Sequence, residues 1–365
     1  IQYGYAFDSK CFTDDFCYPP LVRIRDVKRG YSETYYSGDY PKEYVLASGD
    51  LLVGMDGEFN IARWKCDGAL LNQRVCKLIA KKGTNEEYLR FAMTKALKEI
   101  ERRTAFVTVK HLSAKELNKL QLSVPDLSEQ NRVAKILSRL EKVIDLRRQE
   151  LQKLDNLIKA RFVEMFGDMY LNSKGWSEAK LESMADVVSG ITKGRKTKSE
   201  DLTEVPYMAV SNVKDGYIDW TTVKTIEATQ QEIEQYRLLA DDVLMTEGGD
   251  PDKVGRGAII KEPLENCIHQ NHIFRVRLDE SVMLPEFFAE YLQHQRSKRY
   301  FLGCAKQTTG IASINMTQLR ALPVLIPPLS KQEEFVLFKS QVDKSKVAIL
   351  KNYSQGGVLS YDNQF

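Results

Sequence analysis

The sequence predicts a duplicated α/β (α+β) protein, in which two similar domains are separated by long helices that pair as an antiparallel coiled coil. Two observations predict it: an apolar stripe at helical spacing without Pro or Gly, and a set of segments that occurs twice in the same order. The expected parts are a first domain over 1–127, a central helix over 128–167, a second domain over 168–328, a distal helix over 329–352 and a tail over 353–365.

The central helix carries its apolar residues at steps of three and four from Ser128 to about Phe166. At 1.5 Å rise per residue it would be roughly 58 Å long, which is longer than one ordinary domain is wide. A helix of this length needs a partner along its stripe. The residues expected in that interface are Leu137, Leu140, Ile144, Leu151, Leu154 and Ile158.

The distal helix has its own stripe, formed by Phe335, Phe338, Val342 and Ile349. Two stripes of similar period in one chain most simply pack on each other, and the repeat makes the antiparallel arrangement the expected one. Ser330 and Glu333 fit a capping box. In the central helix Asn131 takes the place of that glutamate, which predicts a weaker cap.

An internal repeat supplies the second observation. Each copy predicts the same series of elements: a strand that leads into a glycine turn, a tight turn before a buried strand, a further strand, and a helix. That helix opens near Glu87 in the first copy and near Glu286 in the second. The matching segments are Pro20–Tyr31 with Pro206–Tyr217, Tyr44–Val53 with Tyr236–Met245, Leu71–Val75 with His269–Ile273, and Leu122–Gln130 with Val324–Gln332.

The two copies differ at their beginnings. Gly175–Asp186 predicts an opening turn and helix before the second domain, whereas Ile1 aligns with Val187. The first domain therefore lacks that opening. We expect Val358–Phe365 to lie against the first domain and to replace part of its missing start.

The composition is that of an ordinary globular protein, with 365 residues, 43% of them hydrophobic and 28% charged, and a net charge of +3. This charge is too small to establish a nucleic-acid partner by itself. No apolar run reaches the ~18 residues of a membrane span, and no signal peptide begins the chain. The six cysteines lack CxxC spacing, which predicts buried thiols in a reducing cytoplasm and no zinc site.

Two motifs open the long helices: Pro125-Asp-Leu-Ser-Glu-Gln130 and Pro328-Leu-Ser-Lys-Gln332. With Gly190-Ile-Thr-Lys-Gly and the strand from Leu238 to Leu244, and through their order and duplication, they make the chain resemble the DNA-specificity (S) subunit of type I restriction–modification systems. The resemblance covers nearly the whole chain except the start of the first domain.

That resemblance implies a function. Each domain would be a target-recognition domain that reads one half of a bipartite, interrupted site in double-stranded DNA. The helices would set the distance between the halves and hold two methyltransferase (M) subunits. Restriction/translocase (R) subunits would join through the M subunits, which would bind S-adenosylmethionine, whereas this chain would bind no cofactor and no membrane.

Candidate DNA contacts in the second domain lie on three loops. The basic loop has four cations in six residues, suited to phosphates, although a solvated surface is the ordinary alternative. A glycine-dense loop and a helix–strand loop offer cations, amides and hydroxyls. The residues are Lys193, Arg195, Lys196 and Lys198; Lys253 and Arg256; and Lys306, Gln307, Thr308 and Thr309.

The first domain is poorer in positive charge, and its candidates are Asn60, Arg63, Arg102, Arg103 and Lys110. The segments 72–74 and 270–272 match between the domains and carry amides that suit adenine edges, although such residues are more often simply outward-facing. His269 and His272 are an odd number of residues apart, which places them on opposite faces of a strand and argues against a metal site.

No methyltransferase, Walker or HExxH signature occurs, so a non-catalytic reader is predicted. Three alternatives remain at this stage: the specificity subunit of another type of restriction–modification enzyme, a coiled-coil adaptor that does not bind DNA, and an enzyme with a dispersed site.

Overall fold

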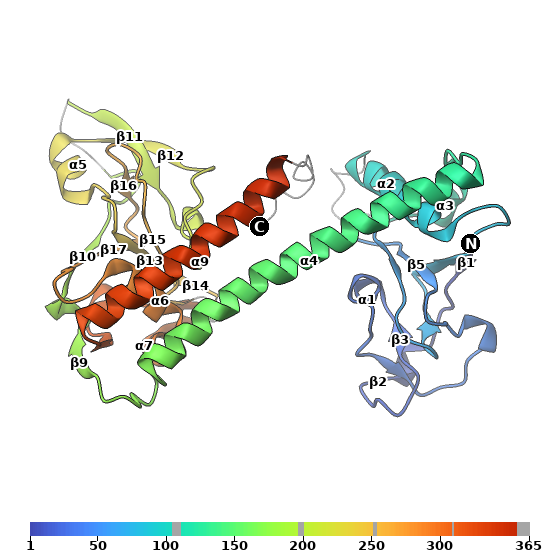
Figure 1. The fold of residues 1–365 in the computed structure, drawn as a ribbon, viewed down its shortest axis with the longest axis horizontal. Helices are drawn as coiled ribbons and strands as arrows, with labels where there is room; N and C mark the ends of the chain where they lie inside the picture. Colours follow the sequence, from blue (N-terminus) through green and yellow to red (C-terminus); the bar gives the residue numbers. More distant parts are fainter. Residues whose placement is uncertain (104–110, 196–200, 251–253, 309, 356–365) are drawn as a thin grey trace. The chain divides into compact units, whose positions relative to one another are not determined.

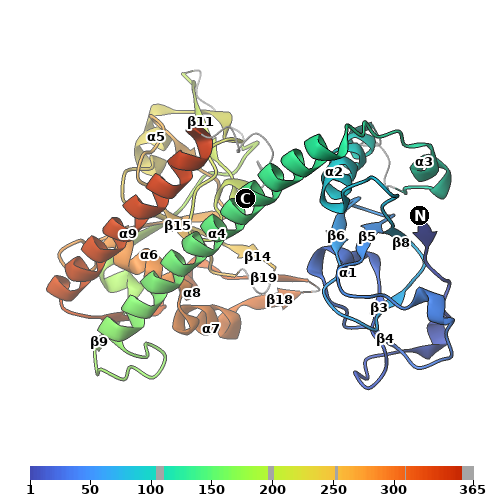
Figure 2. The ribbon, with the colours of Figure 1, turned by 45° about the vertical axis from the view of Figure 1, so that its right-hand side comes forward.

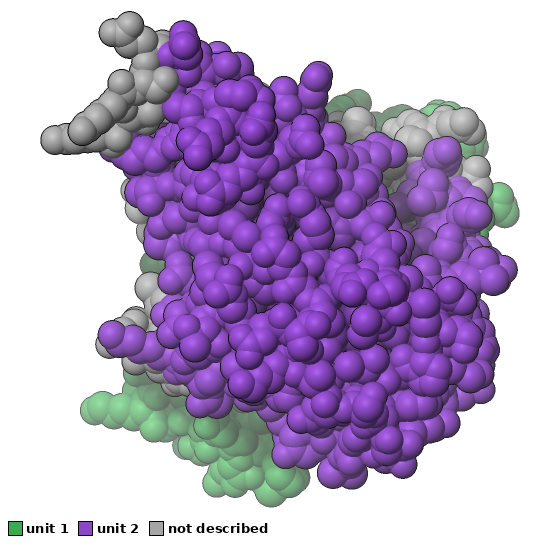
Figure 3. Space-filling view, turned by 90° about the vertical axis from the view of Figure 1, so that its left-hand side faces the viewer, with its two compact units in different colours: residues 1–148 green, residues 149–365 purple. Residues whose placement is uncertain are grey.

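The chain forms two compact units, residues Ile1–Arg148 and Gln149–Phe365 (Figure 3). The computed structural model describes residues 1–103, 111–195, 201–250, 254–308 and 310–355. Helix α4 (Leu127–Phe166) begins in the first unit and ends in the second. In the described part of the chain, no helix is long and apolar enough to cross a membrane.

Unit 1 is built on a four-stranded sheet of order β1-β8-β5-β6, whose strand pairs are antiparallel; Figure 2 shows β8, β5 and β6 side by side. Its elements are β1 (Gln2–Tyr3), η1 (Ser9–Cys11), β2 (Phe12–Thr13), β3 (Leu21–Val22), α1 (Ile24–Arg29), β4 (Tyr35–Tyr36), η2 (Lys42–Tyr44), β5 (Leu51–Gly54), β6 (Ile61–Arg63), β7 (Leu70–Leu71), β8 (Val75–Leu78), α2 (Glu86–Arg103) and α3 (Ala114–Lys119).

All four residues of the central strand β5 are buried. Since successive side chains of a strand point to opposite faces of the sheet, they enter two different cores. Leu51 and Val53 join the core that includes Leu97 of α2. Leu52 joins a second core, with Trp64.

Unit 2 repeats this plan with the sheet β10-β17-β13-β15, so that β13 takes the place of β5. Its elements are β9 (Ser177–Lys180), η3 (Leu181–Ser183), β10 (Ala185–Ser189), β11 (Thr203–Met208), η4 (Val210–Asn212), β12 (Lys224–Ala228), α5 (Gln230–Tyr236), β13 (Val243–Thr246), β14 (Gly248–Gly249), β15 (Gly257–Ile259), β16 (Ile268–His269), β17 (Ile273–Leu278), α6 (Pro285–Gln293), α7 (Gln295–Cys304), β18 (Lys306–Thr308), β19 (Ile311–Ser313), α8 (Met316–Arg320), β20 (Pro323–Ile326) and α9 (Leu329–Gln355).

The alternation of unit 1 recurs in β13. Val243 and Met245 face the core that contains Phe287 of α6, whereas Leu244 faces a separate core. The predicted duplication of a mixed α/β domain is therefore confirmed.

Within unit 2, α9 lies antiparallel to the C-terminal part of α4, as Figures 1 and 2 both show. Arg161 pairs with Glu334 at 2.8 Å, and Lys346 pairs with Asp155 at 2.6 Å, so the numbering runs in opposite directions along the two helices. Next to the first of these pairs, the Phe335 ring lies 5.2 Å from that of Phe162. The predicted antiparallel pairing of the helices is confirmed for this part of α4.

Each long helix is anchored by a buried glutamine near its start. Gln332 accepts a hydrogen bond from the Leu284 N–H (2.9 Å) and donates to the carbonyls of Val282 (3.0 Å) and Pro327 (2.9 Å). In unit 1, Gln130 accepts from the Asn85 N–H (2.8 Å) and donates to the carbonyls of Gly83 (3.2 Å) and Pro125 (2.8 Å). These bonds explain why glutamine ends both Pro-x-Leu-Ser-x-Gln motifs: it ties the helix to the segment that starts α2 or α6.

Several local expectations were wrong. The predicted helix within Gly175–Asp186 is instead β9, η3 and the start of β10, because β9 pairs with β20 in a four-residue antiparallel register. The strand expected over Pro20–Tyr31 is only two residues long and is followed by α1. The helix that opens near Glu286 ends at Gln293, and after the extended residue His294 the chain enters α7.

The helix caps also differ from the prediction. Helix α9 begins at Leu329, so Ser330 lies inside the first turn and not at the cap. Helix α4 begins at Leu127, and the Asp126 carboxylate accepts a hydrogen bond from the Glu129 N–H (3.0 Å), as an N-cap residue does. The proposed contact of Val358–Phe365 with the first domain lies outside the described residues.

Candidate nucleic-acid interface

In unit 2, three segments far apart in the sequence meet where β13 ends. The Glu247 N–H donates to the His272 carbonyl (3.0 Å), and the Ile314 N–H donates to the Glu247 carbonyl (2.8 Å). The turn 270–273 and the hairpin of β18 and β19 therefore flank the end of this strand. Figure 2 shows β14, β19 and β18 adjacent to one another, in the order of their sheet.

Unit 1 builds the same junction at the end of β5. The Met55 N–H donates to the Arg74 carbonyl (2.9 Å), and the Leu112 N–H donates to the Met55 carbonyl (2.7 Å). The turn 72–75 and the segment that leads into α3 thus occupy the places of the turn 270–273 and of β19. The end of the central strand is therefore where equivalent segments of the repeat meet in each unit.

Each junction holds a contact between a nitrogen-bearing side chain and a partly buried carboxylate. In unit 1 the Arg74 Nε lies 3.7 Å from the Asp56 carboxylate, and His111 also contacts Asp56. In unit 2 His272 contacts Glu247 through its Nδ1 atom. Neither carboxylate was predicted from the sequence, because each lies on a segment remote from the turn that it contacts.

Gly190, which opens the basic loop, is required by a close approach of two backbones. A Cβ atom at Gly190 would lie 1.9 Å from the His269 carbonyl oxygen, and one at Gly4 would lie 2.0 Å from the Asn72 carbonyl oxygen. The two glycines therefore occupy equivalent places in the repeat. Gly190 lets the chain after β10 pass close to the turn before β17, and Gly4 lets the chain after β1 pass close to the turn before β8.

The basic loop divides into two kinds of cation. Lys193 is exposed, whereas Arg195 forms a two-bond ion pair with Glu232 of α5 (Nε–Oε1 2.6 Å, Nη2–Oε2 2.5 Å). Hydrogen bonds from the Arg195 guanidinium lower the pKa of Glu232 to about 2, against the opposing effect of partial burial. Arg195 thus fixes this loop to α5. Lys196 and Lys198 lie outside the described residues.

The other unit 2 candidates lie at or near the β13 junction. Lys306 is exposed on β18, and Gln307 and Thr308 belong to the same strand. Arg256 is partly buried just before β15, its backbone carbonyl accepts from the Thr246 N–H (3.1 Å), and its Nε atom has no hydrogen-bond partner among the described residues. Lys253 and Thr309 are not among the residues described.

The unit 1 candidates are more dispersed. Arg63 of β6 pairs with Glu87 (2.5 Å) and Glu86 (3.2 Å) and donates to the Gly49 carbonyl (2.7 Å), which holds it against α2. The Asn60 side chain donates to the Glu58 carbonyl at 3.1 Å. The end of α2 carries Arg102 and Arg103, and the latter pairs with Glu99 (2.5 Å). Lys110 falls in the undescribed segment 104–110.

The predicted helix-interface residues divide along α4. Ile158, Phe335, Val342 and Ile349 are buried, and Leu154 and Phe338 pack against the same core as Phe335. Leu137, Ile144 and Leu151 are partly exposed, and Leu140 is exposed. The buried members all lie in unit 2, where α9 covers α4.

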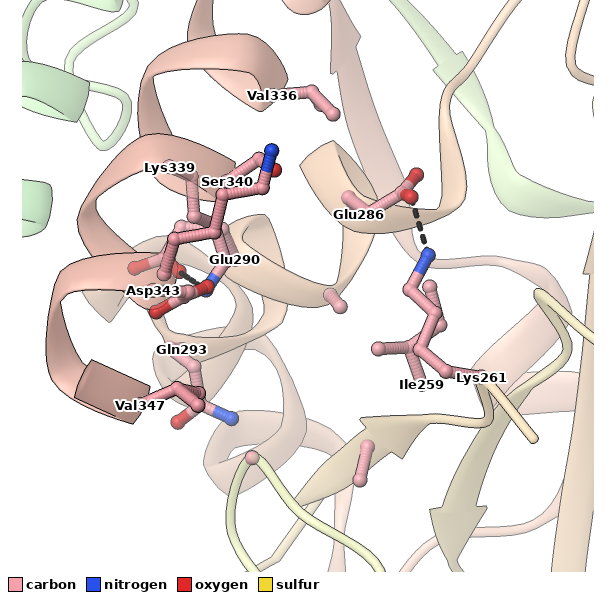
Figure 4. A pocket seen from close by; sticks show the side chains of 14 residues that line it. Ile259, Lys261, Glu286, Glu290, Gln293, Val336, Lys339, Ser340, Asp343 and Val347 are labelled. Atoms are coloured by element: carbon pink, nitrogen blue, oxygen red, sulfur yellow. Dashed lines mark hydrogen bonds and ion pairs between the residues drawn. The ribbon is translucent and has the colours of Figure 1, made fainter. Parts of the chain in front are cut away.

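A groove of about 660 Å³ lies in unit 2 between α6, β15 and α9 (Figure 4). Its charged side chains neutralise one another, since Lys261 pairs with Glu286 and Lys339 lies 3.5 Å from Glu290. It contains none of the residues that the sequence singled out for DNA contact. The groove is therefore separate from the junction at the end of β13.

Comparison with known proteins identifies the family. A family model described as "Type I restriction modification DNA specificity domain" matches residues 1–156 and 173–355, which is most of the chain. The chain belongs to this family. The predicted resemblance to type I specificity subunits is thereby confirmed.

Individual members of this family share between a fifth and a third of their residues with this chain. The type I restriction enzyme EcoBI specificity subunit of Escherichia coli is 27% identical over 362 residues, which cover 92% of this chain and 75% of that protein. The EcoKI specificity subunit of Escherichia coli K12 is 22% identical, over 64% of this chain and 53% of that protein. The chain thus spans three quarters of one relative and about half of the other.

The fold of this family has been seen in crystals. The S subunit of a type I restriction–modification system from M. genitalium matches with a TM-score of 0.53 at 15% identity, over 98% of this chain and 90% of that one. At this identity the match supports the fold, which is a pair of domains joined by a long helix.

Proposed function

We propose that this chain recognises a bipartite, interrupted site in double-stranded DNA. Each unit reads one half of the site through the junction at the end of β5 or β13. The observation that carries the proposal is the repetition of that junction in two units of a chain that belongs to the DNA specificity-domain family. Because the two units differ in sequence, the two half-sites differ as well.

We further propose that the chain acts as a non-catalytic scaffold. Two methyltransferase subunits that use S-adenosylmethionine dock along the helices, and restriction subunits join through them. The names of the relatives as type I restriction enzyme specificity subunits support this part. The 40-residue helix α4, about 60 Å long at 1.5 Å per residue, connects the two units and sets the spacing of the half-sites.

The test is to express the gene together with the methyltransferase genes of its system and to sequence the modified positions in cellular DNA. The expected motif is two short, different half-sites separated by a gap of fixed length and arbitrary sequence. A single uninterrupted motif, or no modification that depends on this chain, would contradict the proposal.

A binding measurement separates a DNA reader from an adaptor. Phosphate contacts release counterions, so the affinity for DNA should fall steeply as salt increases. Replacing Lys193, Arg195 and Lys196 with Ala should weaken binding on all sequences alike, because phosphates carry no sequence information. Since Arg195 also fixes the loop to α5, Lys193→Ala alone is the cleaner variant. Affinity that is independent of salt and of these residues would favour the adaptor.

A further inference from the structure

The two junctions share an arrangement that packing does not require. In unit 1, Arg74 occupies the third position of the turn 72–75 between β7 and β8, and Asp56 lies two residues after the end of β5. In unit 2, His272 occupies the equivalent turn position before β17, and Glu247 directly follows β13. A nitrogen-bearing side chain at the same turn position thus contacts a carboxylate in each unit, although the residue types differ and Asp56 lies one position further along its strand end than Glu247 does.

The backbone of Arg74 gives an independent sign. Its φ angle is +70°, in the left-handed region that glycine and asparagine adopt far more readily than other residues. Conformations of this kind cost free energy and cluster at functional sites. The arginine side chain is nevertheless 52% exposed, so burial of its apolar atoms does not explain why the position carries arginine instead of glycine.

We propose that Arg74 and His272 read base edges in the two half-sites, and that Asp56 and Glu247 are positioning residues that hold them in place. The inference rests on the proposed function, since it names the residues that contact bases within the DNA site. An ionised carboxylate can only accept hydrogen bonds, and Asp56 contacts the Arg74 guanidinium as well as His111. Arg74 Nη1 also lies 3.2 Å from His111 Nε2, which constrains it from a second side.

The chemistry predicts different bases for the two residues. Arginine has only donors, and its fork fits the O6 and N7 acceptors of guanine. A neutral imidazole has one donor and one acceptor nitrogen. The His272 Nδ1 atom faces the Glu247 carboxylate, so the neutral tautomer that fits this contact has Nδ1–H and leaves Nε2 as an acceptor. The amide Nδ2 of Asn271, a donor, lies 3.4 Å from that Nε2 atom, and a base amino group would take its place as the donor. His272 therefore suits the exposed amino group of adenine or cytosine.

The test is to map the modified motif in cells that carry the methyltransferase genes with Arg74→Lys, Arg74→Gly or His272→Ala. Both Arg74 variants should relax one position of one half-site, with discrimination for guanine falling about tenfold or more. The His272 variant should relax one position of the other half-site. Arg74→Gly relieves the backbone at φ +70°, so it should not lower the melting temperature, which separates lost reading from lost folding.

Asp56→Asn tests the positioning role. It should relax the same position as Arg74→Lys while leaving affinity for unrelated DNA unchanged or higher, because a negative charge near phosphates has been removed. The pair Arg29 and Glu33 gives matched controls in the same unit, since its atoms lie 3.6 Å apart and its arginine is 47% exposed. Arg29→Lys and Glu33→Gln should leave the motif unchanged.

Several outcomes would overturn the inference. A wild-type motif in Arg74→Gly and His272→Ala, or equal losses at every position, would show that these residues do not read bases. Relaxation at a different position in Asp56→Asn would show that Asp56 reads a base itself. If the unmodified protein directs no defined motif, the proposed function fails instead.

Discussion

At the scale of single residues, the turns that carry Arg74 and His272 are held in place by glycine. Gly190 lies where the Ile191 N–H donates to the His269 carbonyl (2.9 Å), so the two backbones are too close for a side chain. In the repeat, Gly4 meets the Asn72 backbone in the same way. These glycines are thus needed for the close approach of the strand to the turn, and the left-handed region plays no part, because neither has a positive φ.

Gly190→Ala should destabilise unit 2 by about 3 kcal/mol, since the added methyl group would overlap a backbone carbonyl that has no room to move. The measurement is urea unfolding followed by circular dichroism. Gly303→Ala is the matched control: no atom lies within 4 Å of its added Cβ, and in helix α7 alanine should stabilise by up to about 1 kcal/mol. Equal effects of the two substitutions would refute the close-approach explanation.

His269, at the end of β16, makes the stability of unit 2 depend on pH. Burial lowers its pKa to about 4, although its Nδ1 atom donates to the Ile273 carbonyl (3.1 Å). The unfolded chain, with a histidine pKa of about 6.5, binds the proton more readily. Stability is therefore complete above about pH 6.5 and falls as the pH drops towards 4, by up to roughly 1.4 kcal/mol per pH unit.

His269→Gln should remove this part of the pH dependence. The comparison is the free energy of unfolding of both proteins between pH 7 and pH 4, where the wild type should lose roughly 3 kcal/mol more than the variant. Any constant cost of the substitution cancels in that difference. Parallel pH profiles would mean that His269 is not held neutral by the fold.

At the scale of elements, the long helices depend on their first turn as well as on their stripe. Gln332 has no exposed surface and satisfies one backbone N–H and two carbonyls. An apolar side chain of the same size would leave these three backbone groups without partners. Gln130 does the same for α4, so both motifs have a structural explanation that requires no ligand.

Gln332→Leu should therefore cost about 3–5 kcal/mol, because a buried group left without its hydrogen bond costs about 1–3 kcal/mol. Thermal or urea unfolding of the full chain measures it. Gln341→Leu, an exposed position on the same helix, should change stability by less than about 0.5 kcal/mol. A Gln332 variant as stable as its control would show that the motif is retained for another reason.

At the scale of the whole molecule, each unit has its own hydrophobic cores. Leu51 and Leu52 face different cores of unit 1. Phe335 belongs to a core of unit 2 whose members are drawn from between Ile158 and Val342. Units with separate cores are expected to unfold in separate cooperative transitions. The stripe on α9 contributes to the second of these transitions alone.

Phe335→Ala should lower the melting temperature of one transition only, by roughly 10 °C, because truncation of a buried phenylalanine costs about 3–5 kcal/mol. Differential scanning calorimetry of the full chain tests it. Leu337→Ala, at a side chain that is 63% exposed, is the control and should leave both transitions in place. A single transition, shifted as a whole by Phe335→Ala, would contradict independent cores.

Much of this organisation follows from the sequence. The repeat, the long central helix and the apolar stripes of the two paired helices can be recognised from residue spacing alone. The structure contains the helix Leu127–Phe166 and its antiparallel pairing with α9. The basic loop could also be located, but its charges could not be assigned. The sequence does not reveal that Arg195 forms an ion pair with Glu232, because this pair depends on how α5 packs.

By itself, then, the sequence determined the duplicated domains, the paired helices and the family, because periodicity and repetition are properties of the chain. Tertiary structure decided where strands replace helix, as β9 does by pairing with β20, and which distant residues meet at the ends of β5 and β13. The physical reason is that hydrogen bonds and ion pairs between remote segments leave no trace in local spacing. Asp56 with Arg74, and Glu247 with His272, become visible only when those segments are brought together.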